Sequence, residues 1–439
     1  MKRRDALRWI GGGLAALAAR PLWAAPEAKD DFFIFIHAAG GWDVTLWADP
    51  RNERKGLVEP ASTDNTDIGP ITRWKSVALD GDTDTFELLD HRFGPAIGAL
   101  FDRRDRLTVI NGLAMNTVSH PDGTAYSATG RHLAGGRAVA ASIDVALASE
   151  RGAEQLLPAV AVQFPSAFVG ERLDRRAIPL RVASAATLAK SLTRSDAYID
   201  DADRAAISAV LADEAAGLAG RSVFPEVYER IASQELAQPQ LIGGELEKAF
   251  APKALADRYP QFDYKAKQLG AGALAAAFAV EAIRRDVVRC VGFALGGLDT
   301  HNQNYKQHAH TLQELFGTVA TLLDLLDATP HPHAQGARLA DHTHILVFSD
   351  FCRTPQINLA GGRDHYPNNS ALVISPKFKG GLTFGATDVE QLLPADAKTF
   401  AGGARPIAPP DLMATFLHAF GVDPRAYVRD GEVVAELLR

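Results

Sequence analysis

The feature that most constrains this 439-residue chain is a set of apolar, strand-like runs that each lead into acidic or histidine side chains. The carboxyl ends of parallel strands meet along one edge of a sheet, and ligands bind at that edge. Residues far apart in the sequence can therefore form one Asp/His cluster, a common way for an α/β protein to build a metal site. The four stretches are Phe32–Asp43, Cys290–His301, His344–Asp350 and Gly361–His365.

Alternating strand and helix patterns predict an α/β fold, specifically an α/β/α sandwich with a mainly parallel sheet covered by helices on both faces. Nearly continuous apolar runs indicate strands buried on both sides. Helices with apolar residues at 3–4 spacing are expected at Tyr305–Leu326 and Gly270–Val288. The expected strands are Phe32–His37, Leu107–Asn111, Ala159–Phe164, Ile178–Val182, Val291–Leu295, His344–Phe348 and Ala371–Ile374.

The strand pattern disappears between about residues 188 and 263. This stretch predicts helices at Asp201–Leu218, Pro225–Leu236 and Gly243–Ala256, as an insertion in a single α/β domain spanning residues 26–439. Two interpretations remain open: a lid over the site, or a structural appendage.

Residues 1–25 have the pattern of a twin-arginine export signal. Arg3 and Arg4 precede a short apolar stretch at Trp9–Ala19, and small residues follow at Ala24 and Ala25. The apolar stretch is shorter than the roughly 20 residues of a spanning helix. We therefore expect recognition by the twin-arginine machinery, a periplasmic or secreted protein, and no transmembrane segment in the mature chain. A basic, frayed N-terminal helix is the alternative.

The formal net charge of −7 disfavours a nucleic-acid partner, since such binding depends on Lys and Arg neutralising phosphates. Removal of the basic signal would make the chain more negative still. The two cysteines, Cys290 and Cys352, are too few for a disulfide framework.

Asp43, Asp299 and His301 follow two of the predicted strands at glycine-rich turns. Carboxylate and imidazole groups within one turn are typical of metal sites. The alternative is a purely structural role, because an Asp after such a turn is often a helix N-cap. His308 and His310 are predicted to lie on a helix surface.

Asp350 follows the clearest predicted strand and should emerge at the sheet edge. Arg353 is a candidate clamp for an anionic group, or else an ion-pair partner of Asp350. His365 is a candidate ligand on a glycine-rich loop, and Asp364 either binds metal or orients a histidine.

Ser119 and Thr124 are the candidate nucleophiles. They lie in a segment that predicts a loop entering a helix that ends at Gly130. Backbone N–H groups at a helix start favour an anion. Both residues are equally suited to capping.

The order of these motifs resembles a large, functionally uncharacterised family of twin-arginine-exported bacterial proteins, distantly related to alkaline phosphatases and sulfatases. The resemblance extends to a late helix at Pro409–Leu417 before Gly421 and spans most of the chain. It implies an alkaline phosphatase-like α/β/α sandwich with one or two metals. By that analogy Asp43 and Asp350 share one metal, and Asp299, His301 and His365 hold another.

Two departures from the related enzymes bear on this analogy. Phe351 stands where alkaline phosphatases have a histidine, and Asp299 and His301 are closer in sequence than their counterparts, which argues against a complete two-metal site. The chain also lacks the Cys/Ser-x-Pro-x-Arg signature of conventional sulfatases.

The sequence thus predicts an exported hydrolase that uses Zn²⁺, Mn²⁺ or Ca²⁺ on a small anionic phosphate or sulfate ester. The alternative is a non-catalytic exported protein that keeps the fold to bind a protein partner or to assemble at a surface. Fold alone does not decide between them.

Overall fold

The computed structural model describes residues 30–50, 86–88, 91–191, 200–223, 225, 228, 231–232, 245–302, 304–388 and 390–439. The predicted export signal and most of the predicted helix Pro225–Leu236 lie outside these residues. No helix within the described ranges is both long and apolar enough to cross a membrane.

Among the described residues, eight strands form one large sheet in which only β11 runs antiparallel to its neighbours. This confirms the predicted α/β fold with a mainly parallel sheet. All seven predicted strands are present within a few residues, and β12, which is short and half-buried, was missed. The order is β12 (Leu382–Phe384), β4 (Leu107–Ile110), β11 (Ala371–Ile374), β8 (Thr343–Ser349), β1 (Phe32–Ala38), β7 (Val288–Leu295), β5 (Leu157–Val162) and β6 (Leu180–Val182).

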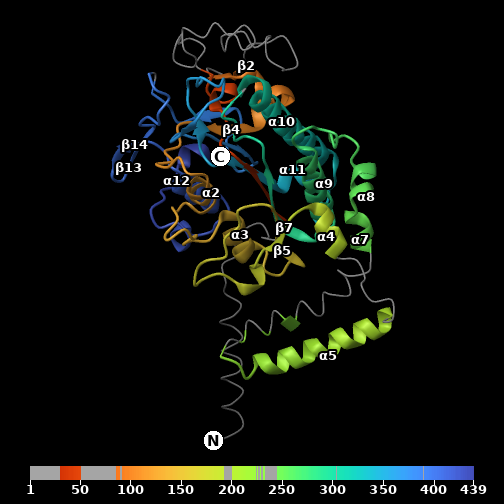
Figure 1. Ribbon diagram of the computed structural model, residues 1–439. Helices are drawn as coiled ribbons and strands as arrows, with labels where there is room; N and C mark the ends of the chain where they lie inside the picture. The colour runs from red at the N-terminus through yellow and green to blue at the C-terminus, as the bar shows by residue number, and fades with distance from the viewer. Residues whose placement is uncertain are drawn as a thin grey trace, which may run out of the picture.

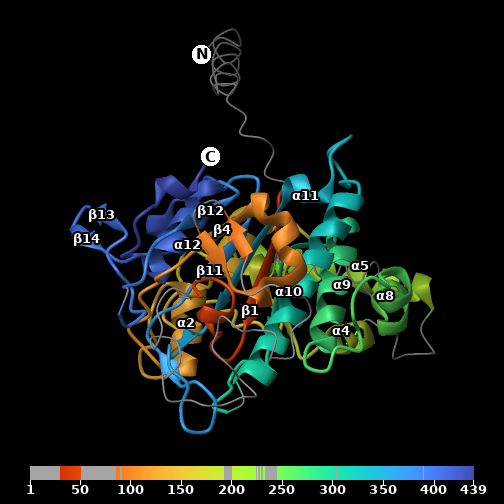
Figure 2. The same cartoon turned by 90° about the horizontal axis from the view of Figure 1, so that it is seen from above.

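Helices cover both faces of the sheet (Figures 1 and 2). Side chains alternate along a strand, so β1 contributes to two cores. Ile34 and Ile36 pack towards α9 (Gly270–Arg284) and α10 (Asn304–Ala328). On the other face, Phe33 and Phe35 belong to the core that includes α2 (His120–Thr129), α3 (Ile143–Arg151) and α12 (Pro409–Ala419).

The central strands end together. Ala38 of β1 is opposite both Leu295 of β7 and Ser349 of β8. Because β11 is antiparallel, its first residue, Ala371, is opposite Phe348 near the end of β8. The loop before β11, which includes β10 (His365–Tyr366), is therefore brought to the same edge as the loops that follow β1, β7 and β8.

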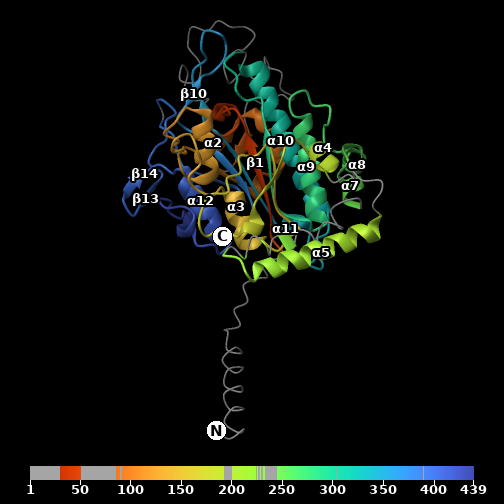
Figure 3. The ribbon, with the colours of Figure 1, turned by 60° about the horizontal axis from the view of Figure 1, so that its bottom comes forward.

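The elements described between β6 and α9 are all helical. They are α4 (Ala185–Ser191), α5 (Asp201–Ala219), α7 (Glu245–Phe250) and α8 (Pro252–Arg258). Pro252 divides the predicted helix Gly243–Ala256 because proline is favoured only in a first turn. Figure 3 shows α5 at the opposite end of the molecule from β10, so α5 does not cover that edge of the sheet as a lid.

The shorter elements are β2 (Phe86–Leu88), β3 (His91–Phe93), β9 (Cys352–Arg353), β13 (Lys398–Phe400), β14 (Gly403–Arg405), α11 (Leu339–His342) and the 3-10 helices η1 (Val44–Leu46), η3 (Pro95–Arg106), η4 (Arg175–Ala177), η5 (Pro424–Ala426) and η6 (Ala435–Leu437).

Phe35→Ala tests the core that joins β1 to the α12 side of the sheet. Phe35 is fully buried, and its ring centroid lies 6.1 Å from that of Phe164 and 6.0 Å from that of Phe416. We expect the free energy of unfolding to fall by about 3–5 kcal/mol in urea titrations, because the substitution leaves a cavity. Val210→Ala, at an exposed position of α5, should change it by less than about 0.5 kcal/mol. Equal effects would contradict the assignment of this core.

Candidate metal centre

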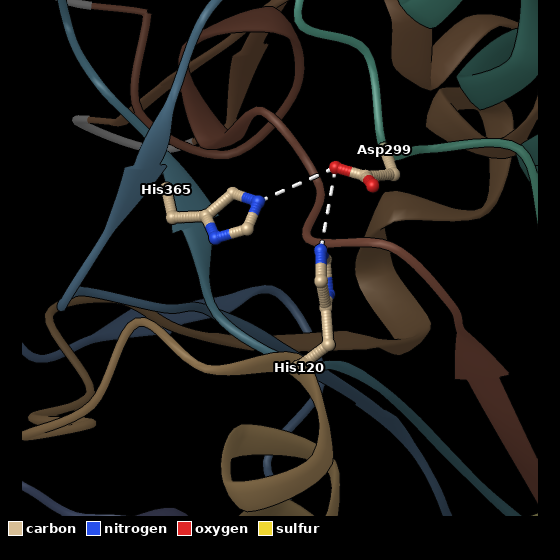
Figure 4. Close-up of side chains that lie close together, drawn as sticks. All are labelled: His120, Asp299 and His365. Atoms are coloured by element: carbon tan, nitrogen blue, oxygen red, sulfur yellow. Dashed lines mark hydrogen bonds and ion pairs between the residues drawn. The ribbon is translucent and has the colours of Figure 1, made fainter.

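Three side chains from separate segments converge at the edge where the central strands end (Figure 4). His120 is the first residue of α2, Asp299 lies in the loop after β7, and His365 is in β10. The Nε2 atoms of both histidines lie 3.3 Å from Oδ1 of Asp299. All three ligand atoms lie within 4.8 Å of one another, close enough to share one metal ion.

His301 adds a third imidazole to this group. Its Nε2 lies 3.0 Å from Asp299 Oδ1 and 3.1 Å from His365 Nε2. Tetrahedral zinc with bonds of about 2.0–2.1 Å separates neighbouring ligand atoms by roughly 3.3 Å. The three distances to Asp299 Oδ1 and the distance between His301 and His365 match this spacing. The group whose ligand atoms all lie within 4.8 Å of one another is His120, Asp299 and His365, so His301 would have to move closer to His120 to complete a tetrahedron.

The other ring nitrogen of each histidine faces an oxygen acceptor. The Nδ1 atoms of His120, His301 and His365 lie 2.7 Å from Asp350 Oδ2, 2.8 Å from Asp364 Oδ1 and 2.8 Å from the Val118 carbonyl oxygen, respectively. Each Nδ1 therefore carries the proton and donates it. A neutral ring with this tautomer presents an unprotonated Nε2 to the cluster, and it is the Nε2 atoms that converge. For His120, the hydrogen bond with Asp350 outweighs burial and raises the pKa, so a metal ion would take the place of a proton on this ring.

His120 gives an independent sign that the cluster suits a cation. Its Nε2 is buried, and the 3.3 Å contact with Asp299 Oδ1 does not have the geometry of a hydrogen bond. A buried polar atom with so poor a hydrogen bond would gain from a closer partner, and a cation between Nε2 and Asp299 would provide one. Three imidazole nitrogens and one carboxylate oxygen match zinc, and they suit calcium poorly because calcium prefers oxygen ligands.

Arg353 holds Asp299 in its ionised form. The guanidinium is fully buried and donates to Asp299 Oδ1 at 2.6 Å, and also to the carbonyl oxygens of Gly40, Gly41, Leu298 and Arg363. Burial alone would raise the pKa of Asp299, but the hydrogen bond from Arg353 and its charge lower the pKa to about 2. All three guanidinium nitrogens are thus engaged within the protein, and Arg353 pairs with Asp299 instead of with Asp350 or an external anion.

Asp350 lies beside the cluster and has other partners. Its carboxylate contacts Nε2 of His37 and Nδ1 of His120, and it accepts hydrogen bonds from the Gly40 N–H and the Thr124 hydroxyl. Burial would raise the pKa of Asp350, but the hydrogen bonds from His120 and His37 outweigh burial and hold the pKa well below its usual range. The carboxylate is therefore an anion at neutral pH.

Asp43 belongs to a different, fully buried network. It caps η1 by accepting a hydrogen bond from the Thr45 N–H at 3.0 Å, as the capping alternative supposed. Its oxygens also accept from Asn304 Nδ2 at 2.7 Å and from the guanidinium of Arg363 at 3.2 Å. No described contact joins Asp43 to Asp350, so the expected pair of carboxylates around one metal is not formed.

The prediction that His308 lies on a helix surface is wrong. His308 is fully buried, and its Nε2 accepts a hydrogen bond from the Asp43 N–H at 2.8 Å. Burial lowers the pKa of His308 to about 3, so the ring is neutral. The helical spacing could have indicated this burial, because His308 precedes Leu312 by one turn and therefore lies on the same apolar face of the helix. His310 lies nearer the surface, 3.4 Å from Glu314.

Packing beneath the cluster explains why a phenylalanine is found at position 351 and a glycine at position 40. The Phe351 ring is fully buried, with its centroid 4.8 Å from that of the His120 ring and 4.6 Å from that of the His365 ring, so it packs against two histidines of the cluster. Gly40 has φ +114°, and a Cβ there would lie 2.5 Å from the Asp299 nitrogen. Only glycine allows this close approach of the β1 and β7 loops.

The two candidate nucleophiles lie in different surroundings. Ser119 is exposed and precedes α2 without making a side-chain capping bond. Its chain neighbours Val118 and His120 both contact the cluster. Thr124 is half-buried and its hydroxyl donates to Asp350 Oδ1 at 3.0 Å. The Cys352 thiol is buried, which raises its pKa and keeps it protonated.

The sequence reasoning missed His37 and the ligand position of His120. His120 was visible as a histidine at the start of a predicted helix, next to Ser119. His37 sits inside an apolar strand, where a lone histidine gives little indication of a site. What distinguishes His37 from an ordinary core histidine is its contact with Asp350, which lies 313 positions further along the chain.

A separate cleft of about 650 Å³ lies at the other end of the sheet. It is lined by Asp30, Asp286, Arg289 and His333, near the amino ends of β1 and β7. Its lining mixes charges of both signs and provides no group of three closely spaced metal-ligating atoms among the described residues. The side chains that could bind a metal ion come together at the opposite edge, at the carboxyl ends of the strands.

Comparison with known proteins identifies the family. Residues 33–432 match the model of a family described as "Protein of unknown function (DUF1501)". The chain belongs to this DUF1501 family. This match confirms the expected membership in a functionally uncharacterised family. It does not test the expected export, which stays a prediction. No curated protein matches the chain significantly.

Two solved structures show distant likeness to this DUF1501 protein. Ps i-CgsB, solved in complex with a neocarrahexaose, is 12% identical with a TM-score of 0.35, and the match covers 92% of this chain and 75% of that one. The PsFucS1 sulfatase from Pseudoalteromonas sp. is 11% identical with a TM-score of 0.33, covering 98% and 75%. Values this low assign no activity.

Asp43→Asn tests whether Asp43 is structural. The substitution keeps the cap of η1 but removes the carboxylate charge that lies 3.2 Å from the buried guanidinium of Arg363, so we expect the free energy of unfolding to fall by about 3–5 kcal/mol. Asp423→Asn is the matched control, because Asp423 caps η5 in the same way but is exposed. Loss of bound zinc from Asp43→Asn, with unchanged stability in urea, would show instead that Asp43 is a ligand.

Proposed function

We propose that this protein is an exported, metal-dependent hydrolase of the alkaline phosphatase/sulfatase type that acts on a phosphate or sulfate ester. The observation that carries the proposal is the convergence of three imidazole Nε2 atoms on Asp299 Oδ1, with each Nδ1 already committed to an oxygen acceptor. A mainly parallel α/β sheet with its site at the carboxyl ends of the strands is compatible with an alkaline phosphatase-like sandwich.

The proposed ligands are His120, Asp299, His301 and His365, around one zinc ion. Asp364 orients His301 through Nδ1 instead of binding the metal. Asp43 and Asp350 are left out because their carboxylates are engaged elsewhere. When bound, the ion would polarise an ester oxygen and offset the negative charge that develops on it.

Ser119 is the better nucleophile candidate. Its hydroxyl is exposed and lies between two residues that contact the cluster, whereas the Thr124 hydroxyl is committed to Asp350. A carboxylate with a strongly lowered pKa accepts a proton poorly, so Asp350 would not activate Thr124. In the proposed reaction the serine oxygen bonds to phosphorus or sulfur as the alcohol leaves, and water then releases phosphate or sulfate.

One observation favours the non-catalytic alternative. Arg353, the expected anion clamp, is fully buried and bonded within the protein. A protein that kept the fold to bind a partner at a surface would have no need of an exposed clamp. The activity measurement below separates the two functions.

Zinc content and ester hydrolysis test the proposal together. We expect about one zinc per chain by mass spectrometry, with loss of most of it in Asp299→Ala and His365→Ala. Hydrolysis of aryl phosphates and aryl sulfates should fall to the background rate in these variants and in Ser119→Ala, while Ser119→Ala keeps its zinc. His310→Ala, a histidine outside the cluster, is the control and should resemble wild type.

A wild-type protein without zinc, and without activity when zinc or manganese is added, would refute the hydrolase. Stoichiometric zinc with wild-type turnover no faster than that of Asp299→Ala would favour the non-catalytic protein. Thr124→Val distinguishes the nucleophiles, because loss of activity there but not in Ser119→Ala would reverse the assignment.

We also propose that residues 1–25 direct export through the twin-arginine machinery to the periplasm or beyond. Replacing both Arg3 and Arg4 by lysine should abolish export, because the pair itself is recognised, and Arg8→Lys should not. Cell fractionation and immunoblotting of the tagged full chain measure this. Equal export of all three proteins would refute the assignment.

A further inference from the structure

We propose that Asp350 is a positioning residue and not a metal ligand: held between His37 and His120, it keeps His120 in the Nδ1–H tautomer, so that Nε2 faces the metal position. This inference rests on the proposed metal site and assigns Asp350 and His37 roles in it. The resemblance to alkaline phosphatases implied the opposite, namely that Asp350 binds metal directly.

The hydrogen-bonding capacity of the Asp350 carboxylate is fully used. Oδ1 contacts His37 Nε2 and accepts from the Thr124 hydroxyl at 3.0 Å. Oδ2 accepts from the Gly40 N–H at 3.1 Å and from His120 Nδ1 at 2.7 Å. An ionised carboxylate offers about four acceptor positions, so these four donors leave none for a metal.

Burial makes these partners necessary. Asp350 is 2% exposed, and a buried carboxylate is tolerated only when it is well hydrogen-bonded. The four donors come from β1, from the turn after it and from α2, so the anion joins these elements to the end of β8. Gly123 permits this contact, because a Cβ there would lie 2.3 Å from the Asp350 carbonyl oxygen.

The consequence for His120 follows from its two nitrogens. Both nitrogens face a carboxylate, but Nδ1 lies 2.7 Å from Asp350 Oδ2 and Nε2 lies 3.3 Å from Asp299 Oδ1. In the neutral ring the proton belongs on Nδ1, which has the closer acceptor, and Nε2 then has a lone pair for a metal. His120 Nε2 makes only the 3.3 Å contact with Asp299 Oδ1, which does not have hydrogen-bond geometry, and this is compatible with an unprotonated Nε2. Replacing such a carboxylate by an amide removes the charge and permits the wrong tautomer.

His37 acts one step further away. It lies in β1, is 5% exposed, and contacts Asp350 through Nε2. Its ring packs against Phe348, with centroids 5.5 Å apart. His37 thus holds the oxygen of Asp350 that does not contact His120 and fixes the angle at which the carboxylate meets the ring. We expect loss of His37 to loosen this alignment without removing the charge.

The experiment uses the full chain with ¹⁵N-labelled histidine, first without metal. Because the hydrogen bond with Asp350 raises the pKa of His120, the shifts are measured over a pH titration, and above that pKa they should report a protonated Nδ1 and an unprotonated Nε2. Asp350→Asn should change the His120 shifts and leave those of His301 in place, and Asp364→Asn should do the reverse. This matched pair separates a specific effect on one histidine from a general disturbance of the fold.

Zinc titrations give the second readout. Asp350→Asn should weaken zinc binding about 10–100-fold, the usual effect of losing such an outer partner, and His37→Ala should weaken it less. Asp423→Asn, an exposed carboxylate away from the site, should bind zinc as wild type does.

Two results would overturn the inference: a neutral His120 ring with its proton on Nε2 in the metal-free wild type, or an Asp350 oxygen about 2.0–2.2 Å from zinc in a crystal structure of the loaded protein. The wild-type measurement needs no variant to fold. If the wild type shows the expected tautomer but binds no zinc, the positioning role stands and the hydrolase proposal fails.

Discussion

The common end point of β7, β1 and β8 is the constraint on which the rest of the structure depends. Because Leu295, Ala38 and Ser349 are in register, the loops after three strands leave the sheet at the same level. The antiparallel β11 adds a fourth loop, since its amino end lies where its neighbours have their carboxyl ends. A shift of one residue in any of these pairings would move Asp299 or His365 away from the cluster, or Asp350 away from His120, and would reverse which face the shifted strand buries.

Charge at this edge is balanced locally. Two buried guanidinium groups each neutralise a carboxylate, Arg353 with Asp299 and Arg363 with Asp43. Arg353 also binds four backbone carbonyl oxygens, so it fixes the loops as well as the charge. A fully buried pair such as Arg363–Asp43 adds little net stability, because the attraction is offset by the cost of removing both charges from water. The effect of both pairs here is to hold particular loop conformations.

The carboxylates near the site divide by exposure. Asp43 and Asp350 are buried and saturated with donors, so they act on the protein itself. The side chains of Asp299 and Asp364 are about half exposed, and they face the histidines from the solvent side. Only Asp299 is among the ligand atoms that converge. Residue type therefore identifies the candidates, while burial and partners decide which of them can meet a ligand.

Much of the fold was readable from local pattern. The strands are apolar runs long enough to be recognised one at a time, and α10 shows its buried face over many turns. β12 was missed because three half-buried residues carry too little pattern. The antiparallel direction of β11 was also hidden, because direction is set by the pairing partner and not by the strand's own residues.

The sequence by itself determined the α/β class, most strand positions, and the segments that carry Asp and His at one sheet edge, since these depend on short-range periodicity. Only the tertiary structure decided that His120 joins Asp299, His301 and His365, that Asp43 pairs with Arg363, and that Asp350 turns to His37 and His120. Each of these choices is a contact between residues far apart in the chain, made by competition among several similar side chains. Burial and the number of available hydrogen-bond donors decide which of these side chains can meet a ligand, and both depend on the folded structure.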